Sequence, residues 1–372
     1  MKTVFLLNHV PDPRINKRIG IAKTMGEVVV ICVRRASQDL FEPYYKDVVH
    51  EIIDIDLPPS KQFIKRFLAS KKYEKQAFDL LLKYSPTIVY TEGMDSLKIA
   101  VEYKKRNTCK IIYEVADLRE LFIERPKNLI FFVLSSIIKA TEKRLVRFVD
   151  RLVLTSEKFH EAYYCNIISK EKMIYMPNTP DEGPFQNYLR KNSGEFTVGF
   201  IGGVRYMDQM KMLVDAAEIV DCKVLFAGGG GYGDYERITD YCKGKENITF
   251  TGKYVFDRDI ARLYGMVDCV YSVYDADNAN VRIALPNKLY EAVLCGLPII
   301  VAKGTYLSEV VEDWGVGVSV SHKDVNELAT TLEKMKNDKS FYDRMVQGCS
   351  SKSSEVTAAK YNTSLEKVFQ ML

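Results

Sequence analysis

The chain has 372 residues, which is long enough for two domains of ordinary size, each with its own core. Its 47% hydrophobic and 27% charged residues are typical of a globular protein. The formal net charge of +4 is small against 53 basic and 49 acidic residues. Because no tract combines basic and aromatic residues, the composition argues against a nucleic-acid partner.

The cysteines and histidines argue against disulfides and metal centres. The eight cysteines stand singly, with no CxxC pair, as expected for reduced thiols in a cytoplasmic protein and not for a disulfide framework or a zinc site. None of the four histidines pairs with another at ligand spacing. The sequence therefore predicts a cytoplasmic location, and it predicts no metal or other cofactor.

The first residues predict a strand and not a secretory signal. A short apolar run at 3–7 is followed by Asn8 and His9, and no small-residue cleavage site comes after them. The longest apolar run, at 129–138, has ten residues, whereas a helix needs about 20 to cross a bilayer. We therefore expect no membrane-spanning helix.

Strands and helices alternate along the first half of the chain. Helical patterns, for example at 63–84 and 95–106, lie between most of the apolar runs that are typical of strands. The expected strands are 4–8, 27–33, 87–91, 110–115 and 151–156. Such alternation predicts parallel βαβ units with helices on both faces of a sheet.

A stretch rich in proline, glycine and polar residues, 177–195, then interrupts the pattern as a linker does. The alternation starts again after it. Strands are expected at 196–202, 223–228, 248–252, 269–274, 298–303 and 315–320. We therefore divide the chain into an N-terminal domain at 1–185, a linker at 186–195 and a C-terminal domain at 196–357.

The predicted fold class is α/β, with two doubly wound, Rossmann-like domains in tandem. In such folds ligands bind at the carboxyl ends of the strands, and two such edges facing each other form a cleft. The last helix, at 358–372, carries an apolar stripe of Leu365, Val368, Phe369 and Leu372. That stripe would suit either domain, including a return to the N-terminal one.

The segment GGGGYG, 228–233, matches the G-x-G-x-x-G pattern of dinucleotide-binding loops. That fingerprint also requires an acidic residue at the end of the next strand, about 20 positions on, and here the next strand reads NITFTG. The motif also follows the second strand of its domain and not the first. We therefore interpret it as a flexible turn between a strand and a helix.

A second glycine turn combines with two cations. Gly202 and Gly203 end the first strand of the C-terminal domain, where backbone amides are free to approach an anion. Arg205 and Lys211 flank the start of the next helix. Arginine, lysine and a helix N-terminus together bind diphosphates. The alternative is a pair of surface cations on an amphipathic helix.

The segment LPNKLYEAVLCGLPIIV, 285–301, predicts a helix with polar residues on its first two turns. Asn287, Lys288 and Glu291 are three and four residues apart, so they share one side of it. A carboxylate there would accept hydrogen bonds from the two hydroxyls of a ribose, and Lys288, nearer the positive end of the helix, would favour phosphate. The alternative is a lysine–glutamate pair on a solvated face.

A resemblance to a known family bears on both segments. The stretch ALPNKLYEAVLCGLPIIVAKGTY resembles the donor-site segment of the retaining GT-B glycosyltransferases of family four, which build bacterial surface polysaccharides. Three further stretches are similar to other segments of that family: ITFTGKYVFDRDIARLYGMVDCVYSVYD, NHVPDPRINKRIGIAKTMG and RLVLTSEKFHEAYY. The resemblance implies that Glu291 binds the ribose of a sugar nucleotide and that Arg205 and Lys211 clamp its diphosphate.

The chain departs from the family pattern at one glutamate position and in the surrounding loop, where YDADNANVRIALPN replaces the usual glycine-bearing loop. Many members carry two glutamates separated by seven residues, and the first of these positions is Ile283 here. A subgroup of the family has such a Pro-Asn-Lys form, so the resemblance still implies a transferase. The candidates for contact with the donor sugar are then Asp275, Asp277, Asn278 and Asn280.

The resemblance also implies a mechanism, which is transfer with retention of configuration and without a protein nucleophile or a metal. Catalysis then consists of positioning and of stabilising the departing phosphates with Arg205, Lys211 and the helix end. Asp117, just past the end of a strand, would orient or deprotonate the acceptor hydroxyl, or else it caps a helix. His9 and Arg14, at another strand end, are further candidates for contact with acceptor or phosphate.

The segment 125–151 combines the longest apolar run with Lys127, Lys139, Lys143, Arg144, Arg147 and Arg151. Such a basic amphipathic segment is suited to a membrane surface, here the inner face of the cytoplasmic membrane. A core-facing helix with a cationic outer face explains the pattern as well. We expect peripheral membrane contact, because acceptors of the resembled family are often lipid-linked.

The leading hypothesis is a nucleotide-sugar-dependent hexosyltransferase that acts on a glycan or lipid-linked acceptor in capsule, lipopolysaccharide or other surface-glycan assembly. A sugar-nucleotide 2-epimerase is the second hypothesis, because such enzymes share the tandem fold, but their pattern of acids is not found here. A non-catalytic sugar-nucleotide-binding subunit is the third, suggested by Ile283.

Overall fold

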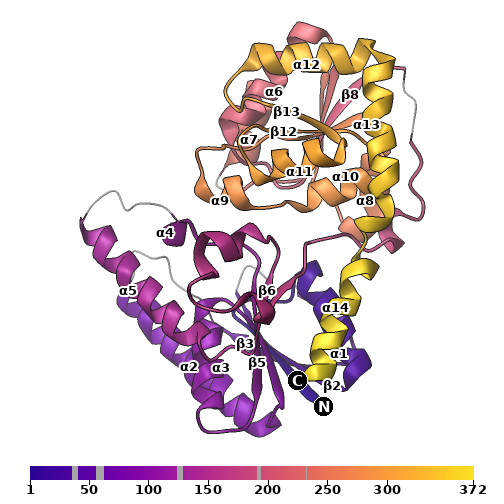
Figure 1. Cartoon of the computed structure of the whole chain (residues 1–372). Coiled ribbons are helices and arrows are strands. Elements are labelled where there is room, and N and C mark those ends of the chain that lie inside the picture. The colour runs from indigo at the N-terminus through magenta and orange to yellow at the C-terminus, as the bar shows by residue number, and fades with distance from the viewer. Residues whose placement is uncertain (36–40, 56–62, 124–128, 191–193, 232) are drawn as a thin grey trace. The chain divides into compact units, whose positions relative to one another are not determined.

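The structure is a computed structural model that describes residues 1–35, 41–55, 63–123, 129–190, 194–231 and 233–372 (Figure 1). The chain forms two compact units: unit 1 comprises Met1–Met176 and Tyr361–Leu372, and unit 2 comprises Pro177–Lys360. Each unit contains a parallel sheet with helices packed on it, so the predicted fold class is confirmed.

The sheet of unit 1 has seven strands in the order β3-β2-β1-β4-β5-β6-β7. The strands are β1 (Lys2–Leu7), β2 (Glu27–Arg34), β3 (Val49–Asp54), β4 (Ile88–Glu92), β5 (Lys110–Val115), β6 (Arg151–Leu154) and β7 (Met173–Tyr175). The edge strands β3 and β7 are not among the expected strands. Both are only partly buried, so they lack the continuous apolar run that marks a strand covered on two faces.

The helices of unit 1 begin and end as follows: α1 (Pro13–Met25), α2 (Phe63–Tyr84), α3 (Met94–Lys104), α4 (Glu120–Ile123) and α5 (Leu129–Val146), with one π-helical turn at His160–Tyr164 and one 3-10 turn at Lys170–Lys172. Asp12 caps α1, because its carboxylate accepts a hydrogen bond from the Ile15 amide at 2.8 Å. Within the described ranges, no helix is both long enough and apolar enough to cross a bilayer.

The last helix, α14 (Ala358–Met371), starts in unit 2 and ends in unit 1. Leu365, Val368 and Phe369 are buried in the core of unit 1 together with Phe5 and Ile19. In Figure 1 this yellow helix lies beside α1. Its apolar stripe therefore covers unit 1.

The sheet of unit 2 has six strands in the order β10-β9-β8-β11-β12-β13, which is the classic Rossmann arrangement. The strands are β8 (Thr197–Ile201), β9 (Lys223–Ala227), β10 (Ile248–Gly252), β11 (Cys269–Ser272), β12 (Ile299–Ala302) and β13 (Gly317–Val320). The helices are α6 (Met207–Val220), α7 (Asp234–Tyr241), α8 (Phe256–Tyr264), α9 (Ala279–Ile283), α10 (Asn287–Leu294), α11 (Tyr306–Trp314), α12 (Val325–Asn337) and α13 (Lys339–Lys352), with 3-10 turns at Gly183–Phe185 and Ser353–Glu355. One core cluster joins the sheet to α6 and α12, and a second joins it to α8, α10 and α11.

The boundary between the units lies between Met176 and Pro177, before the linker expected at 186–195. The segment that follows belongs to unit 2, because Phe185 is buried there against Phe256 and Tyr264, with ring centroids 6.2 and 6.0 Å apart. Prolines and glycines mark the end of regular structure, whereas a unit boundary depends on where packing contacts stop.

Candidate functional site

Two glycine turns lie side by side at the carboxyl edge of the unit 2 sheet. Gly202 follows β8 with a φ of 137°, and its N–H donates to the Ala227 carbonyl at 2.8 Å. Gly228 follows β9 with a φ of 131°, and a Cβ on it would lie 2.1 Å from the Gly202 carbonyl oxygen. Only glycine fits such a close approach. The first glycine of GGGGYG thus packs two turns together, in agreement with the interpretation as a turn.

Lys288, from α10, lies beside the first of these turns. A Cβ on Gly202 would lie 2.9 Å from its Nζ. The lysine is 6% exposed, donates a hydrogen bond to the Tyr274 hydroxyl at 2.7 Å and lies 4.3 Å from the centroid of the Phe200 ring. In the part of the chain that the structure describes, no carboxylate forms an ion pair with it. An anion would compensate this buried charge.

Lys288 and Arg205 both affect the pKa of the Tyr274 phenol. Burial raises the pKa of the Tyr274 phenol, but the two cations outweigh it and hold that pKa below its ordinary value of 10. Arg205 is exposed, and its guanidinium carbon lies 5.7 Å from the centroid of the Tyr274 ring. We call Gly202, Arg205, Tyr274 and Lys288 the basic corner.

Glu291 lies one turn further along α10 and is 3% exposed. Its Oε2 accepts a hydrogen bond from the Tyr264 hydroxyl at 2.6 Å, and its Oε1 accepts one from Asn287 Nδ2 at 2.8 Å. Burial and the neighbouring carboxylate raise the pKa of the Tyr264 phenol well above its ordinary value. Because Lys288 and Glu291 are both buried, the alternative of an ion pair on a solvated face is wrong.

Lys211 has a different neighbour from the one expected. Its Nζ lies 5.1 Å from the centroid of the Tyr241 ring, at the end of α7. The Tyr241 hydroxyl donates in turn to Asp215 on α6 at 2.6 Å. The structure therefore brings Lys288, and not Lys211, to the Gly202 turn.

The other residues that were expected on the donor side lie in the loop before α9 and, for Asn280, in α9 itself. Asn278 caps α9, since its side-chain oxygen accepts a hydrogen bond from the Asn280 amide at 2.8 Å. Ile283 is the last residue of that helix and is half-buried. Asp275 and Asp277 lie in a separate cluster with a histidine, described below.

In unit 1 an ion-pair network lies at the carboxyl ends of β4 and β5. Arg14 approaches Glu92 Oε2 at 2.8 Å and Glu114 Oε1 at 2.7 Å, and Arg18 approaches the same Glu114 oxygen at 3.4 Å. Burial raises the pKa of the Glu114 carboxyl, but Arg18 and Arg14 lower it to about 2. His9 Nε2 lies 3.3 Å from Glu92 Oε2. Burial lowers the pKa of His9, but the hydrogen bond to this carboxylate raises it and the net shift is upward. Arg14 and His9 thus both have carboxylate partners within the fold.

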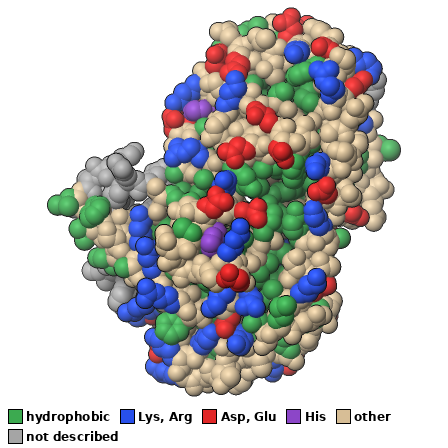
Figure 2. Space-filling view, in the orientation of Figure 1, with side chains coloured by type: hydrophobic (Ala, Val, Ile, Leu, Met, Phe, Trp, Pro, Cys, Tyr) green, Lys and Arg blue, Asp and Glu red, His purple; other side chains and the backbone are tan. Residues whose placement is uncertain are grey.

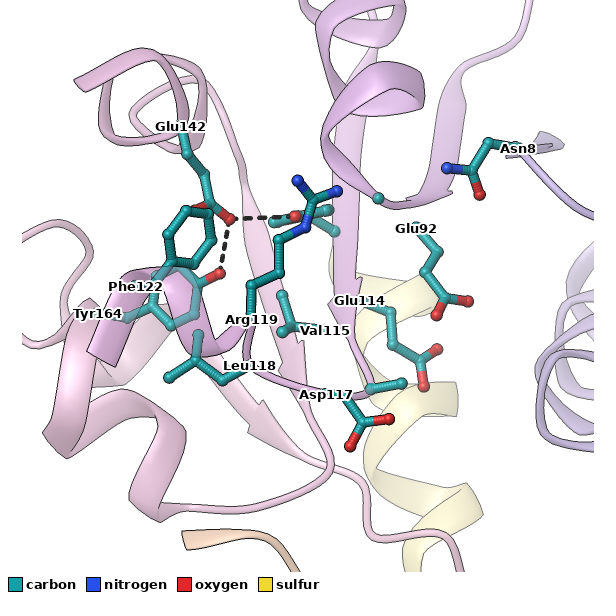
Figure 3. Close-up of a pocket in the computed structure, with 13 residues that line it drawn as sticks. Asn8, Glu92, Glu114, Val115, Asp117, Leu118, Arg119, Phe122, Glu142 and Tyr164 are labelled. Carbon is teal, nitrogen blue, oxygen red and sulfur yellow. Dashed lines mark hydrogen bonds between the residues drawn. The ribbon is translucent and has the colours of Figure 1, made fainter. Parts of the chain in front are cut away.

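A cavity of about 230 Å³ lies beside this network (Figure 3). Asp117, in the loop between β5 and α4, is exposed and lines it together with Glu92 and Glu114. On the other side of the cavity lies Glu142, and Arg119 lies between the two groups in Figure 3. The structure therefore places Asp117 among carboxylates that the sequence did not indicate.

Glu142, from α5, also lines the cavity and is buried, with 1% of its surface accessible. Of the carboxylates that line the cavity, only Glu114 is less exposed. Its Oε1 accepts hydrogen bonds from the Tyr164 hydroxyl at 2.8 Å and the Tyr113 hydroxyl at 3.2 Å. Burial raises its pKa despite these bonds. Sequence reasoning missed Glu92, Glu114 and Glu142, although an acidic residue within an apolar strand or helix is a signal that could have found them.

Comparison with known proteins bears on unit 2 and on the fold. Residues 195–338, which include the basic corner and Glu291, match the family described as Glycosyl transferases group 1. The succinoglycan biosynthesis protein ExoL of Rhizobium meliloti (strain 1021) is 20% identical over 261 residues, which cover 66% of this chain. The match spans 63% of the length of ExoL.

Solved structures match the whole chain. Sucrose-phosphate synthase (tll1590) from Thermosynechococcus elongatus is 13% identical with a TM-score of 0.77, and the match covers 100% of this chain and 99% of that one. HepE (Alr3699) from Anabaena, solved in complex with UDP, is 17% identical with a TM-score of 0.73 over 100% of both chains. The chain therefore has the GT-B fold, and its residues 195–338 match the glycosyl transferases of group 1.

Proposed function

We propose that the protein is a retaining, nucleotide-sugar-dependent hexosyltransferase of GT-B family four that acts in surface-polysaccharide assembly. The observation that carries this proposal is the buried Lys288 ammonium beside Gly202, with the buried Glu291 carboxylate one turn further along the same helix. A sugar nucleotide offers a diphosphate to the cation and ribose hydroxyls to the carboxylate. ExoL, a succinoglycan biosynthesis protein, and HepE, solved with UDP, support this class of function.

In the proposed reaction the bond between the donor C1 and the diphosphate oxygen breaks, and its electron pair goes to the diphosphate. Lys288 and Arg205 stabilise the charge that develops there, and the Gly203 amide approaches it, whereas the Gly202 amide already donates to the Ala227 carbonyl. Lys211 is proposed as a further diphosphate ligand, which requires it to leave the Tyr241 ring. The step as proposed uses no metal ion.

The acceptor oxygen forms its new bond to C1 on the face that the diphosphate leaves, so the configuration is retained. Its proton passes to Asp117 or to the departing phosphate. The acceptor is proposed to be a glycan or a lipid-linked sugar, and the pathway to be capsule, lipopolysaccharide or related surface-glycan synthesis.

The test is turnover by the full chain with UDP-, GDP- and other nucleotide sugars, with and without glycan or lipid-linked acceptors. Release of nucleoside diphosphate only in the presence of an acceptor supports a transferase, and NMR of the product reports its anomeric configuration. Isomerisation of the donor alone would identify a 2-epimerase instead. Binding without turnover would identify a non-catalytic subunit.

We also propose that α5 contacts the inner face of the cytoplasmic membrane. One stripe of this helix is exposed, first with apolar side chains and then with basic ones: Leu129, Phe132, Val133, Ile137, Lys143 and Arg144. Figure 2 shows hydrophobic side chains at the left edge, over the first turns of α5. The apolar half would enter the interface and the basic half would meet anionic headgroups. Lys127 lies outside the described residues.

A further inference from the structure

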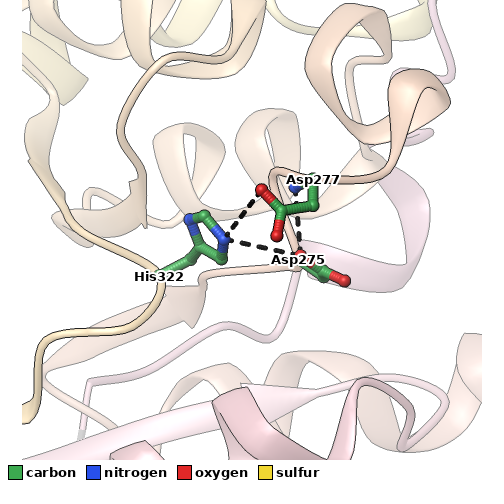
Figure 4. Close-up of side chains that lie close together, drawn as sticks. All are labelled: Asp275, Asp277 and His322. Atoms are coloured by element: carbon green, nitrogen blue, oxygen red, sulfur yellow. Dashed lines mark hydrogen bonds and ion pairs between the residues drawn. The ribbon is translucent and has the colours of Figure 1, made fainter.

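Three side chains with potential metal ligands converge at the carboxyl edge of the unit 2 sheet. Asp275 and Asp277 follow β11, and His322 follows β13 (Figure 4). His322 Nε2 lies 3.4 Å from Asp275 Oδ1 and 3.8 Å from Asp277 Oδ1. All three ligand atoms lie within 4.8 Å of one another.

The imidazole of His322 has an unusual environment. Its Nε2 is shielded from solvent and has no hydrogen-bond partner among the residues that the structure describes, although two carboxylate oxygens face it. A nitrogen lone pair and two carboxylate oxygens repel one another unless positive charge lies between them. Either a proton on Nε2 or a cation coordinated by all three atoms supplies that charge.

Internal hydrogen bonds hold the backbone of the acidic loop. The Asp277 amide donates to Asp275 Oδ1 at 3.0 Å, and the Asn278 amide donates to the Asp275 carbonyl at 3.1 Å. The Arg282 guanidinium donates to the carbonyls of Ala276 and Asp277 at 3.1 and 2.9 Å. Ligands on an ordered loop lose less conformational freedom when they bind a metal.

Groups outside the cluster also hold His322 and Asp277 in position. The Gln209 side-chain amide donates to the His322 carbonyl at 3.0 Å. The Lys323 ammonium pairs with Asp277 Oδ2, whereas Oδ1 faces His322. The lysine therefore leaves one oxygen of Asp277 for a metal ion.

We propose that Asp275, Asp277 and His322 bind one divalent cation. Two carboxylate oxygens and one imidazole nitrogen suit Mn²⁺ or Zn²⁺. Zn²⁺ binds such atoms at about 2.0–2.2 Å, so two ligands of one tetrahedral ion are roughly 3.3–3.6 Å apart, close to the 3.4 Å between His322 and Asp275. The remaining coordination positions go to water or to an anionic oxygen.

The cation site shares no residue with the proposed diphosphate contacts, Lys288 and Arg205. The sequence predicts no metal because His322 is far from the two aspartates along the chain, so no ligand spacing is visible. The fold brings these residues together by placing the ends of β11 and β13 at one edge of the sheet.

The test uses the full chain and Mn²⁺ alone. The four histidines give four imidazole C2–H resonances in an NMR spectrum, and His322→Gln identifies the one that belongs to His322. Substoichiometric Mn²⁺ is expected to broaden that resonance first, because paramagnetic broadening falls steeply with distance. Added Zn²⁺ is expected to reverse the broadening.

The stoichiometry is measured in the same samples by electron paramagnetic resonance. Wild type is expected to bind one Mn²⁺ per chain, and Asp275→Asn to bind it at least tenfold more weakly. Asp257→Asn, which removes an exposed carboxylate on α8, is the matched control and should bind like wild type.

A His322 resonance that broadens no earlier than those of the other histidines would overturn the proposal. The cluster would then be an ion pair between a protonated imidazole and two carboxylates. The broadening is measured on wild type, and His322→Gln serves only to assign the resonance. A protein that fails to bind sugar nucleotides but binds Mn²⁺ here would contradict only the proposed transferase.

Discussion

Lys288 and Tyr274 form a buried pair in which the ammonium donates to the phenol oxygen at 2.7 Å. A buried lysine normally pairs with a carboxylate, and a neutral tyrosine carries no full negative charge. The ammonium charge beside the Gly202 turn is therefore largely uncompensated. This imbalance costs stability without a ligand and favours an anionic one.

Lys288→Met is expected to separate ligand binding from stability. Methionine fills a similar volume without the buried charge, so the melting temperature of the ligand-free protein should stay the same or rise. The affinity for the matching nucleotide sugar should fall at least tenfold, which corresponds to about 1.4 kcal/mol. Thermal shift and calorimetric titration measure both quantities. Lys243→Met, at an exposed position, is the control, and unchanged affinity in Lys288→Met would contradict the proposal.

Glu291→Gln should weaken the binding of nucleotide sugars about 10- to 100-fold, because hydrogen bonds to a charged group contribute about 1.5–3 kcal/mol. Binding of inorganic pyrophosphate should change little, since the proposed role of Glu291 is toward the ribose. Calorimetric titration with both ligands distinguishes these effects. Glu309→Gln, at an exposed position on α11, provides the comparison. An equal loss for both ligands would argue against a ribose contact.

Gly202→Ala and Gly203→Ala form a matched pair. Alanine at Gly202 would adopt a φ of 137° and place its Cβ 2.9 Å from Lys288 Nζ, so we expect a loss of about 1–2 kcal/mol in unfolding free energy and weaker donor binding. At Gly203 the nearest atom to a Cβ is the Gly229 carbonyl oxygen at 3.9 Å, so the change should be nearly neutral. Urea unfolding measures both variants. Equal losses of stability in the two variants would show that the position of Lys288 does not depend on the conformation of this turn.

The lowered pKa of Glu114 predicts how the free energy of unfolding depends on pH. Its pKa is lowered to about 2 in the folded chain from an ordinary value of 4.5, so its stabilisation is present above pH 4.5 and is lost as the pH falls toward 2. Glu114→Gln leaves Arg18 without its buried carboxylate and should cost about 3–5 kcal/mol at pH 7. Urea unfolding at several pH values should show the difference between wild type and variant shrinking below pH 4.5. A difference that is constant with pH would contradict this assignment.

The apolar half of the α5 stripe should determine membrane binding. Replacing both Phe132 and Ile137 by serine is expected to reduce binding to anionic vesicles at least tenfold, since each buried apolar side chain contributes about 1.5–3 kcal/mol. Co-sedimentation with anionic and zwitterionic vesicles measures this. Ile219→Ser, which changes an equally exposed residue on α6, should have no effect. Unchanged binding in the double variant would contradict the membrane proposal.

Most strands could be predicted because a parallel strand that is buried on both faces needs a continuous apolar run, as in β2, β5 and β9. The edge strands β3 and β7 have one poorly covered side and so lack that signal. The domain boundary was misplaced toward 186–195, because the proline- and glycine-rich composition does not reveal that Phe185 packs into unit 2.

The sequence by itself determined the alternation of strands and helices and the grouping of Asn287, Lys288 and Glu291 on the first turns of one helix. Both depend on residues only a few positions apart. Only the tertiary structure decided that Lys288 meets Tyr274, and that Lys211 lies against Tyr241.

The tertiary structure also decided which charged groups, far apart along the chain, lie close together. Arg14 meets Glu114, and His322 faces Asp275, across long separations in the chain. Such pairs form because parallel strands bring their carboxyl ends to one edge of a sheet, and local periodicity carries no information about which side chains meet there.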